Sequence, residues 1–563
     1  MFIPLVILSI TISNYYWTVV RYNVNVPCSD DYGVALQFLN NFTDENSLLS
    51  KVGLLFDQHV DHRVMFPRLV VLLDFFFQGH VNFLSIVVIG NLGLVWIAIL
   101  LFVSSPRQPA MILLFCPVVL LLFQLQHWEN TGFPTASIQS FYVIFFVLAS
   151  LYLLCVEANW SLPLACATFF LAVFTSGNGM FCVLPGAFIL INQNRYKALG
   201  VWIFIFLCSV SFYFYHYSHQ NTKILELLLE KPLERITTFF VAIGGFINFS
   251  KAWEPSGIGY PLSIMFGVIV TLFFLYLTFS KYYLRAPALY GFLFFLLITC
   301  AAMSVSRVSH YSANELSTVS RYKIVSLCCI SVSYLILIDL WKSLGLFKAL
   351  IFIPLGLVYN SAGNEKNLSI FKSHTERLLE SSWAIYSSND YSKLVDWNPA
   401  LSAETLRQSQ AKDIYILPDL RDEFLKRVPD AYQLPAVSPE QIVPADSTVK
   451  YQFTIHTTKD GVRCGTRKAW ALAKGKVTKR NFFVLKDSVK SYFFSTGIEY
   501  RGDLSEMMMA IDPSDKTNYS DSGFNVCVAT SGLSRGTYEV GILLETWDRF
   551  FYYIPAPDKI VLK

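Results

Sequence analysis

The sequence predicts an α-helical polytopic membrane protein that ends in a soluble C-terminal region. Hydrophobic residues make up 54% of the 563-residue chain and charged residues only 15%, with a mean hydropathy of +0.45. A soluble globular protein carries about 25% charged residues. The apolar residues also gather in long runs, and a run of about 20 residues crosses a bilayer as a helix. Composition and run length therefore both indicate the membrane class.

About eleven apolar runs have the length of a membrane span or come close to it. Residues 236–249 form a further apolar stretch of about 14 residues, a length that predicts a re-entrant or interfacial piece rather than a span. The predicted spans lie near residues 2–20, 82–104, 109–126, 136–156, 161–177, 179–193, 199–216, 259–280, 286–304, 324–341 and 346–361.

Basic residues in the short connections orient these spans. Lys and Arg are enriched in cytoplasmic loops, so the connections that carry them are predicted to lie in the cytoplasm. The loops 21–81 and 305–323 and everything after about residue 362 are then outside. The net charge of +4 is small and its basic residues form no patch, which excludes nucleic acid as an expected partner. The orienting residues are Arg107, Arg195, Lys197, Lys281, Arg285, Lys342 and Lys348.

The composition changes to that of an ordinary soluble protein near residue 362. Residues 362–447 are predicted to form an extracytoplasmic helical region and a proline-containing linker. From 448 to 563, short β-prone runs such as 481–485 and 537–542 alternate with turn residues, which predicts a β-sandwich. The chain is thus expected to have a membrane body over 1–361 followed by these two outer regions, an extracytoplasmic α+β arrangement.

Polar residues that could carry chemistry fall on the predicted outer side in five groups. A carboxylate can act as a general base toward a hydroxyl, and a guanidinium can bind a phosphate through two hydrogen bonds. Together these groups suit the transfer of a sugar from a lipid phosphate. The members of the five groups are Asp30 and Asp31; His59, Asp61, His62, Arg63 and Arg68; Gln126, Glu129 and Asn130; Ser176 and Asn178; and Arg307, Arg321 and Tyr322.

Each group also has a simpler interpretation. The two adjacent aspartates fit a helix cap, and Arg63 or Arg321 fits an anchor at lipid headgroups. His59 and His62 have a spacing that allows metal binding, although such a pair is more often hydrogen-bonded at an interface. Residues 126–130 fit the end of a helix. The chemical hypothesis depends on all five groups occurring on one side of the membrane.

This pattern resembles the GT-C class of integral-membrane glycosyltransferases, which use polyprenyl-phosphate sugars. More narrowly, it is similar to bacterial enzymes that decorate O-antigen or a related surface polysaccharide, including serotype-converting glucosyltransferases. The resemblance covers about residues 1–361 and implies a GT-C-like fold for the membrane body. The motifs that carry it are Asp30-Asp31-Tyr32, His62-Arg63-Val64-Met65-Phe66-Pro67-Arg68-Leu69, Gln126-His127-Trp128-Glu129-Asn130, Ser176-Gly177-Asn178-Gly179 and Ser320-Arg321-Tyr322.

The resemblance implies a catalytic base in the first outer loop, which maps onto Asp30 or Asp31, and the choice between them stays open. Some members of the class use a divalent metal ion. This sequence has no convincing set of metal ligands, so the cofactor is left undetermined. The residues expected to bind the donor phosphate are Arg63, Arg307, Arg321 and Tyr322. Those expected to bind the rest of the substrates are His62, Gln126, Glu129, Asn130 and Asn178.

The expected function is a hexosyl transfer at the bacterial inner membrane. A sugar such as glucose would pass from undecaprenyl phosphate to a surface polysaccharide such as the O-antigen of lipopolysaccharide, on the periplasmic side. The expected partners are this donor, the polysaccharide acceptor and the lipid bilayer. One alternative is an O-antigen polymerase or ligase that uses a polyprenyl-diphosphate glycan. Another is a non-enzymatic transporter of a polyprenyl-linked sugar, which predicts charged or broken helices at mid-membrane.

Overall fold

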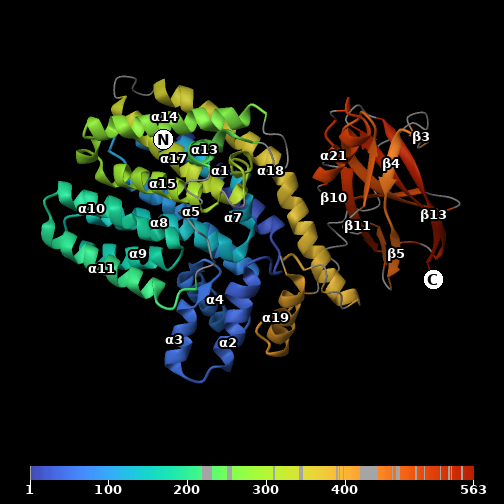
Figure 1. The fold of residues 1–563 in the computed structure, drawn as a ribbon, viewed down its shortest axis with the longest axis horizontal. Helices are drawn as coiled ribbons and strands as arrows, with labels where there is room; N and C mark the ends of the chain where they lie inside the picture. The colour runs from blue at the N-terminus through green and yellow to red at the C-terminus, as the bar shows by residue number, and fades with distance from the viewer. Residues whose placement is uncertain are drawn as a thin grey trace. The chain divides into compact units, whose positions relative to one another are not determined.

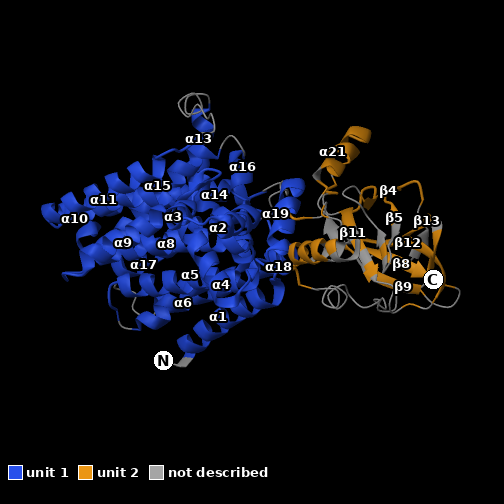
Figure 2. Ribbon diagram, turned by 90° about the horizontal axis from the view of Figure 1, so that it is seen from below, with its two compact units in different colours: residues 1–371, 396–416 blue, residues 372–395, 417–563 orange. Residues whose placement is uncertain are grey.

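The computed structural model of the chain divides into two compact units (Figure 2). Unit 1 comprises residues 1–371 and 396–416, and unit 2 comprises residues 372–395 and 417–563. The residues that the structure describes are 2–108, 110–218, 231–249, 257–307, 311–341, 347–388, 391, 394–396, 398–418, 442–444, 446–458, 461–464, 469–487, 491–499, 501–515, 517–519, 522–529, 533, 535–546 and 550–562.

Unit 1 is a bundle of apolar helices (Figure 1). Among the described residues, eight helices are long and apolar enough to cross a membrane, which makes the chain a polytopic membrane protein by composition and length. They are α1 (Phe2–Tyr22), α5 (Phe83–Ser104), the run from Met111 to Gly132, α8 (Pro134–Leu154), α11 (Tyr196–Phe214), α14 (Gly259–Phe279), α15 (Pro287–Ser306) and α17 (Ser320–Leu340).

Three of the eleven predicted spans are not long helices of this kind. The run 161–193 is divided by an extended backbone at Ser176 into two shorter apolar helices, α9 (Ser161–Val173) and one formed by η3 (Gly177–Cys182) and α10 (Val183–Asn192). The predicted span 346–361 is the first part of α18 (Phe347–Ser388), which continues for 42 residues. A count of eleven spans therefore stays a prediction. Residues 236–249 fall in a short helix, α13 (Pro232–Gly244), followed by η4 (Gly245–Ile247).

The run from Met111 to Gly132 is interrupted where polar side chains replace the missing helical hydrogen bonds. It consists of α6 (Met111–Leu122), η2 (Leu125–His127) and α7 (Trp128–Gly132). Asn360 donates to the carbonyl oxygens of Leu120 and Phe123 at 2.8 and 2.9 Å, and the His127 imidazole lies 2.9 Å from the Leu122 oxygen. An apolar environment requires such internal partners for free carbonyl groups. The break at Phe123 and Gln124 separates the apolar helix α6 from the polar segment 126–130.

The loop between α1 and α5 is a small helical layer in its own right. A late segment, α19 (Pro399–Ala411), packs against this layer. The elements of the loop are η1 (Tyr32–Gln37), α2 (Phe38–Asp44), α3 (Leu48–Phe56), β1 (Gln58–His59), β2 (His62–Arg63) and α4 (Met65–Gln78). The two remaining short elements of unit 1 are η5 (Tyr282–Leu284) and α16 (Ala313–Leu316).

Unit 2 contains two β-sheets that share an apolar core, and all strand pairs except β3–β13 are antiparallel. One sheet has the order β4-β7-β11-β6-β5, with β10 paired to β11, and the other has the order β3-β13-β12-β8-β9. Inward side chains from both sheets, among them Phe483, Phe524 and Ile542, form one buried cluster. The strands are β3 (Ile442–Pro444), β4 (Val449–Gln452), β5 (Ile455–Thr458), β6 (Gly461–Cys464), β7 (Trp470–Ala473), β8 (Thr478–Lys486), β9 (Ser491–Ser495), β10 (Gly497–Glu499), β11 (Gly523–Ala529), β12 (Gly536–Thr546) and β13 (Phe551–Leu562).

The structure adds one helix to the predicted strands of 448–563, α21 (Gly502–Ile511). It also divides the predicted region 362–447 differently. Residues up to 371 and 396–416 belong to the membrane unit, whereas 372–395 and the residues after 416 belong to unit 2. The reason is that α18 continues without a break through residue 361, and α19 packs on η1 and α2.

Candidate functional site

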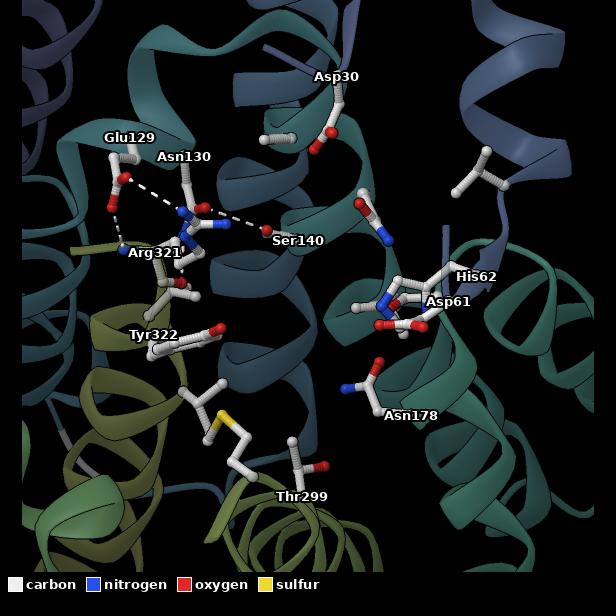
Figure 3. Close-up of a pocket in the computed structure, with 18 of the residues that line it drawn as sticks. Asp30, Asp61, His62, Glu129, Asn130, Ser140, Asn178, Thr299, Arg321 and Tyr322 are labelled. Carbon is white, nitrogen blue, oxygen red and sulfur yellow. Dashed lines mark hydrogen bonds and ion pairs between the residues drawn. The ribbon is translucent and has the colours of Figure 1, made fainter. Parts of the chain in front are cut away.

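A cavity of about 480 Å³ lies in unit 1, where several spans end or begin. Its walls come from the segment after α1, the β1–β2 hairpin, α7, α8, η3, the end of α15 and the start of α17 (Figure 3). A volume of this size falls in the range of small-molecule sites. Its polar lining residues are Ser29, Asp30, His59, Asp61, His62, Glu129, Asn130, Gln139, Ser140, Ser176, Asn178, Thr299, Ser306, Arg307, Arg321 and Tyr322.

The two adjacent aspartates have different environments. Ser29 has a left-handed backbone with φ of 50°, and the chain then enters η1 directly after Asp31. Asp30 lines the cavity and its side chain is half-exposed. Asp31 is fully buried and accepts hydrogen bonds from the backbone N–H of Cys28 at 3.0 Å and from the N–H and hydroxyl of Thr135 at 3.0 and 2.8 Å. Asp31 thus ties the loop that follows α1 to the start of α8.

Replacing Asp31 by Asn is expected to destabilise the protein. Burial raises the pKa of Asp31 to about 6, so at pH 7.5 the group is a carboxylate that accepts from three donors. An amide turns one accepting oxygen into a donor and leaves a buried N–H or hydroxyl unpaired, which costs about 1–3 kcal/mol. Thermal unfolding of the purified protein at pH 7.5 measures this as a lower Tm. Asp30→Asn is the matched neighbour and should keep the Tm of the parent; equal Tm values for both variants would contradict the assignment.

His59 pairs with Asp30 at the rim of the cavity. The His59 Nε2 atom lies 3.5 Å from Asp30 Oδ1, and the β1–β2 turn that presents it has a left-handed Val60 with φ of 50°. Gly33 makes room for the ring, because a Cβ atom there would lie 2.5 Å from His59 Cε1. The hydrogen bond with His59 lowers the pKa of Asp30 below its usual value. Asp30 is therefore ionised at neutral pH and able to accept a proton.

Glu129 and Asn130 join α7 to the start of α17. Glu129 accepts from the Ser320 hydroxyl at 2.5 Å and from the Arg321 backbone N–H at 3.0 Å, and its Oε1 lies 3.7 Å from Arg321 Nη2. Asn130 donates to the Arg321 carbonyl oxygen at 2.8 Å and accepts from the Ser140 hydroxyl at 3.1 Å. Both side chains line the cavity, and their hydrogen bonds hold the Arg321 backbone in place (Figure 3).

Two guanidinium groups and a phenol form one part of the wall. Arg307 follows α15, and Arg321 and Tyr322 lie in the first turn of α17; all three line the cavity. The Nε atom of Arg321 is buried and has no hydrogen-bond partner among the described residues. Guanidinium groups bind phosphate through charge-assisted hydrogen bonds. This part of the cavity is suited to an anion.

His62 and Asn178 contribute polar groups on another part of the wall. Within the described part of the chain, His62 Nδ1 and Asn178 Oδ1 are buried without a hydrogen-bond partner. Burial and, after it, the positive charge of Arg307 lower the pKa of His62 to about 4, so its ring is neutral at pH 7. Figure 3 shows Asp30 between the Arg321 side of the cavity and the His62 and Asn178 side. A neutral imidazole and an amide suit hydroxyl groups, since each can donate and accept.

The structure places three predicted site residues outside the cavity lining: Asp31, Arg63 and Gln126. The Arg63 guanidinium donates to the backbone oxygens of Tyr213, Phe56 and Tyr215, which ties the hairpin to the end of α11. Gln126 is buried, donates to the Phe246 oxygen at 2.8 Å and accepts from the Tyr359 hydroxyl at 2.8 Å. These side chains are occupied within the fold. Their contacts make them structural connections between distant segments.

The other eight predicted residues line the cavity together: Asp30, His62, Glu129, Asn130, Asn178, Arg307, Arg321 and Tyr322. Four lining residues, Gln139, Ser140, Thr299 and Ser306, had no signal in the sequence. They lie in the apolar helices α8 and α15, where Ser and Thr commonly bond back to the preceding turn. Only their shared position on the wall distinguishes them.

The cavity thus combines a half-exposed ionised carboxylate, two guanidinium groups and several hydroxyl-binding side chains. Such a set can deprotonate a hydroxyl and stabilise a leaving phosphate. In the described ranges, no group of three or more His, Cys, Asp or Glu side chains could hold a metal ion. Comparison with known proteins found no match: no family model fits the sequence, and no curated protein or solved structure is significantly similar to it.

Proposed function

We propose that the protein is a membrane glycosyltransferase of the GT-C type. It would transfer a sugar such as glucose from undecaprenyl phosphate to a hydroxyl of a surface polysaccharide such as the O-antigen of lipopolysaccharide. The observation that carries the proposal is one cavity in which the Asp30 carboxylate and the Arg307 and Arg321 guanidinium groups line the same space. The reaction would take place at the periplasmic face of a bacterial inner membrane, where positive-inside orientation puts these segments.

The position of the cavity along the spans supports chemistry at a membrane surface. Spans α1 and α15 reach it with their C-terminal ends, and α8 and α17 begin there. Successive spans run in opposite directions, so these ends belong to one face of the membrane. A transporter would have its binding site near the midplane of the bilayer, whereas the charged lining residues Asp30, Arg307 and Arg321 lie at or beyond the ends of these spans. A polyprenyl carrier, by contrast, presents its sugar and phosphate at the surface while its hydrocarbon chain stays in the bilayer.

In the proposed reaction the acceptor hydroxyl displaces the lipid phosphate from the anomeric carbon. Asp30 accepts the hydroxyl proton as the new carbon–oxygen bond forms, and the bond to the phosphate oxygen breaks with its electron pair on the phosphate. Arg321 and Arg307 stabilise the negative charge that develops there. Displacement from the opposite side inverts the configuration at the anomeric carbon. His59 beside Asp30 offers the proton a path onward to solvent.

The remaining lining residues would orient the two substrates. His62 and Asn178 carry buried polar atoms that have no hydrogen-bond partner among the described residues, so a sugar hydroxyl bound there would satisfy groups that otherwise carry a desolvation cost. Tyr322 lies next to Arg321 and can donate its hydroxyl to the phosphate. Glu129 and Asn130 would act mainly by holding Arg321, because their carboxylate and amide are engaged with the start of α17.

Transfer from a labelled donor tests the proposal directly. The full-length protein in proteoliposomes is incubated with radiolabelled undecaprenyl-phosphoglucose and isolated polysaccharide, and the label in the polysaccharide is counted. Incorporation from this donor is the expected result. Incorporation only from a polyprenyl-diphosphate oligosaccharide would instead indicate a polymerase or ligase. Movement of the labelled lipid between leaflets without incorporation would indicate a transporter.

Replacing His59 by Ala is expected to shift the acidic limb of the pH profile. The hydrogen bond from His59 holds the pKa of Asp30 down, so its loss raises that pKa. A base is active only when ionised, and kcat/KM should then begin to fall at a higher pH than in the parent enzyme. His59→Gln keeps an N–H donor and should leave the limb closer to its original position. An acidic limb that stays in place in His59→Ala would contradict this role.

A further inference from the structure

We propose that Asp61 determines which sugar the cavity accepts, because its carboxylate receives hydrogen bonds from sugar hydroxyl groups beside His62 and Asn178. The donor sugar would then be a hexose with free hydroxyl groups rather than an aminodeoxy sugar. This inference rests on the proposed function, whose donor site it describes. Asp61 would act on specificity alone and take no part in the proton transfer proposed for Asp30.

The backbone of Asp61 is held in place at the turn of the β1–β2 hairpin. Its carbonyl oxygen accepts from the Tyr217 hydroxyl at 3.0 Å and from the Tyr213 hydroxyl at 3.4 Å. Val60, the preceding residue of the turn, has a left-handed backbone, and its carbonyl oxygen accepts from the Gln58 amide at 2.6 Å. These bonds fix the point from which the Asp61 side chain leaves the hairpin.

The carboxylate of Asp61, by contrast, is open to a ligand. The residue is exposed and lines the cavity, and no hydrogen bond or ion pair among the described residues engages its carboxylate oxygens. An ionised carboxylate only accepts hydrogen bonds, and its two oxygens can take two hydroxyl groups at once. The other two carboxylates of the lining, Asp30 and Glu129, are engaged with His59 and with the start of α17. Asp61 is therefore the lining carboxylate that remains for a substrate.

Two further polar groups with unmet hydrogen bonds lie near Asp61. His62 Nδ1 and Asn178 Oδ1 are buried and lack a partner among the described residues. Figure 3 shows Asp61 and His62 side by side, with Asn178 next to them, on the side of the cavity away from Arg321. Gly177 allows the close approach, because a Cβ atom there would lie 3.3 Å from His62 Nδ1. The hairpin and the start of η3 thus form one polar wall.

The mixture of donors and acceptors on this wall favours hydroxyl groups over a charged amine. A sugar hydroxyl can donate to Asp61 and also accept from the Asn178 amide, whereas an ammonium group only donates. Burial and, after it, the positive charge of Arg307 lower the pKa of His62 to about 4, so a positive charge acts on this wall. That charge repels an ammonium group but not a hydroxyl. A hexose therefore fits the wall better than an aminodeoxy sugar.

Donor binding tests this role of Asp61 without depending on transfer. The full-length protein in detergent micelles is titrated with undecaprenyl-phosphoglucose and with its monodeoxy analogues, each of which lacks one sugar hydroxyl, and native mass spectrometry gives each Kd. In the parent, the analogue that lacks the hydroxyl bound by Asp61 should bind about 10- to 100-fold more weakly, the range for a hydrogen bond to a charged group. In Asp61→Ala, that analogue and the glucose donor should bind almost equally well.

Asp57→Ala is the matched control, because Asp57 is an exposed carboxylate of the same loop outside the cavity lining, and it should keep the discrimination of the parent. Equal binding of all the analogues by the parent, or tighter binding of an aminodeoxy donor, would overturn the proposal. So would an Asp61→Ala variant that weakens every donor by the same factor, since a purely structural role has that effect. Thermal unfolding compares the variants first, and Asp61→Asn replaces Asp61→Ala if the latter does not fold.

Failure of the proposed function gives a different result from failure of this inference. Discrimination that depends on Asp61, in a protein that transfers no label to polysaccharide, would keep the sugar specificity and remove the glycosyltransferase assignment. Label transfer by the parent, combined with unchanged discrimination in Asp61→Ala, would keep the assignment and remove the role of Asp61.

Discussion

Asp30→Asn is expected to lower kcat for sugar transfer by about 10²–10⁴-fold, the usual contribution of a general base. The reason is the position of this carboxylate: it lines the cavity, is half-exposed and is kept ionised by His59. An amide has nearly the same shape but cannot accept the acceptor's proton. Initial rates with labelled donor, at saturating donor and acceptor, measure the effect. The KM for the donor should change little, because the phosphate contacts come from other residues.

Two further variants make this result specific. Asp57→Asn removes an exposed carboxylate from the same loop but outside the cavity lining, and it should retain the parent rate. Asp31→Asn should lower the Tm, while Asp30→Asn should not. Full activity of Asp30→Asn in a folded protein would remove Asp30 from the mechanism. If Asp30→Asn is fully active and Asp31→Asn is stable but inactive, Asp31 would be the base and Asp30 would not.

Arg321→Ala is expected to raise the KM for the polyprenyl-phosphate sugar by about 10- to 100-fold, since a hydrogen bond to a charged group contributes about 1.5–3 kcal/mol. Arg321 lines the cavity and has a buried Nε that lacks a partner among the described residues. Rates measured over a range of donor concentrations give KM and kcat separately. The value of kcat should fall as well, because in the proposed reaction the same guanidinium stabilises the leaving phosphate.

The contact between Arg321 and Glu129 requires its own control. The Arg321→Ala substitution removes the guanidinium but keeps the backbone. Glu129 therefore still accepts hydrogen bonds from the Ser320 hydroxyl and from the backbone N–H of residue 321. Glu129→Gln weakens the ion pair while keeping the guanidinium, and should affect the donor KM less than Arg321→Ala. Arg321→Lys keeps the charge but loses the bidentate geometry, and its donor KM should lie between those of Glu129→Gln and Arg321→Ala. An unchanged donor KM in Arg321→Ala would show that the phosphate binds elsewhere.

The sequence predicted cavity-lining residues correctly at several ends of predicted spans. Glu129, Arg307 and Arg321 lie at span ends that the alternation of apolar runs and loops places on one side, and the structure brings all three into one cavity. The lining residue Ser140 lies inside a helix, and no local pattern separated it from an ordinary polar residue of a span. Its hydrogen bond to Asn130 identifies it only in three dimensions.

Arg63 illustrates why a cluster of charged residues can mislead. It lies between His62 and the start of α4, so a sequence of mixed charges predicted a phosphate ligand there. Its partners are backbone oxygens of Phe56, Tyr213 and Tyr215, two of them about 150 positions later in the chain. A guanidinium binds any suitable arrangement of oxygens, and the sequence does not show which oxygens will be near. The same limit applies to Gln126, whose partners Phe246 and Tyr359 come from distant segments.

The amino-acid sequence by itself determined that the chain has a membrane body of apolar helices and a later region rich in strands. Both depend on hydrophobic content and periodicity within windows of about 5 to 20 residues, which are local properties. Only the tertiary structure decided that Asp30 faces the cavity while its neighbour Asp31 is buried against Thr135. Asp30 and Asp31 are adjacent and of the same residue type, so the local sequence pattern does not distinguish them. Their environments differ because a single turn at Ser29 directs one toward the cavity and the other toward α8, a contact made across more than 100 residues of chain.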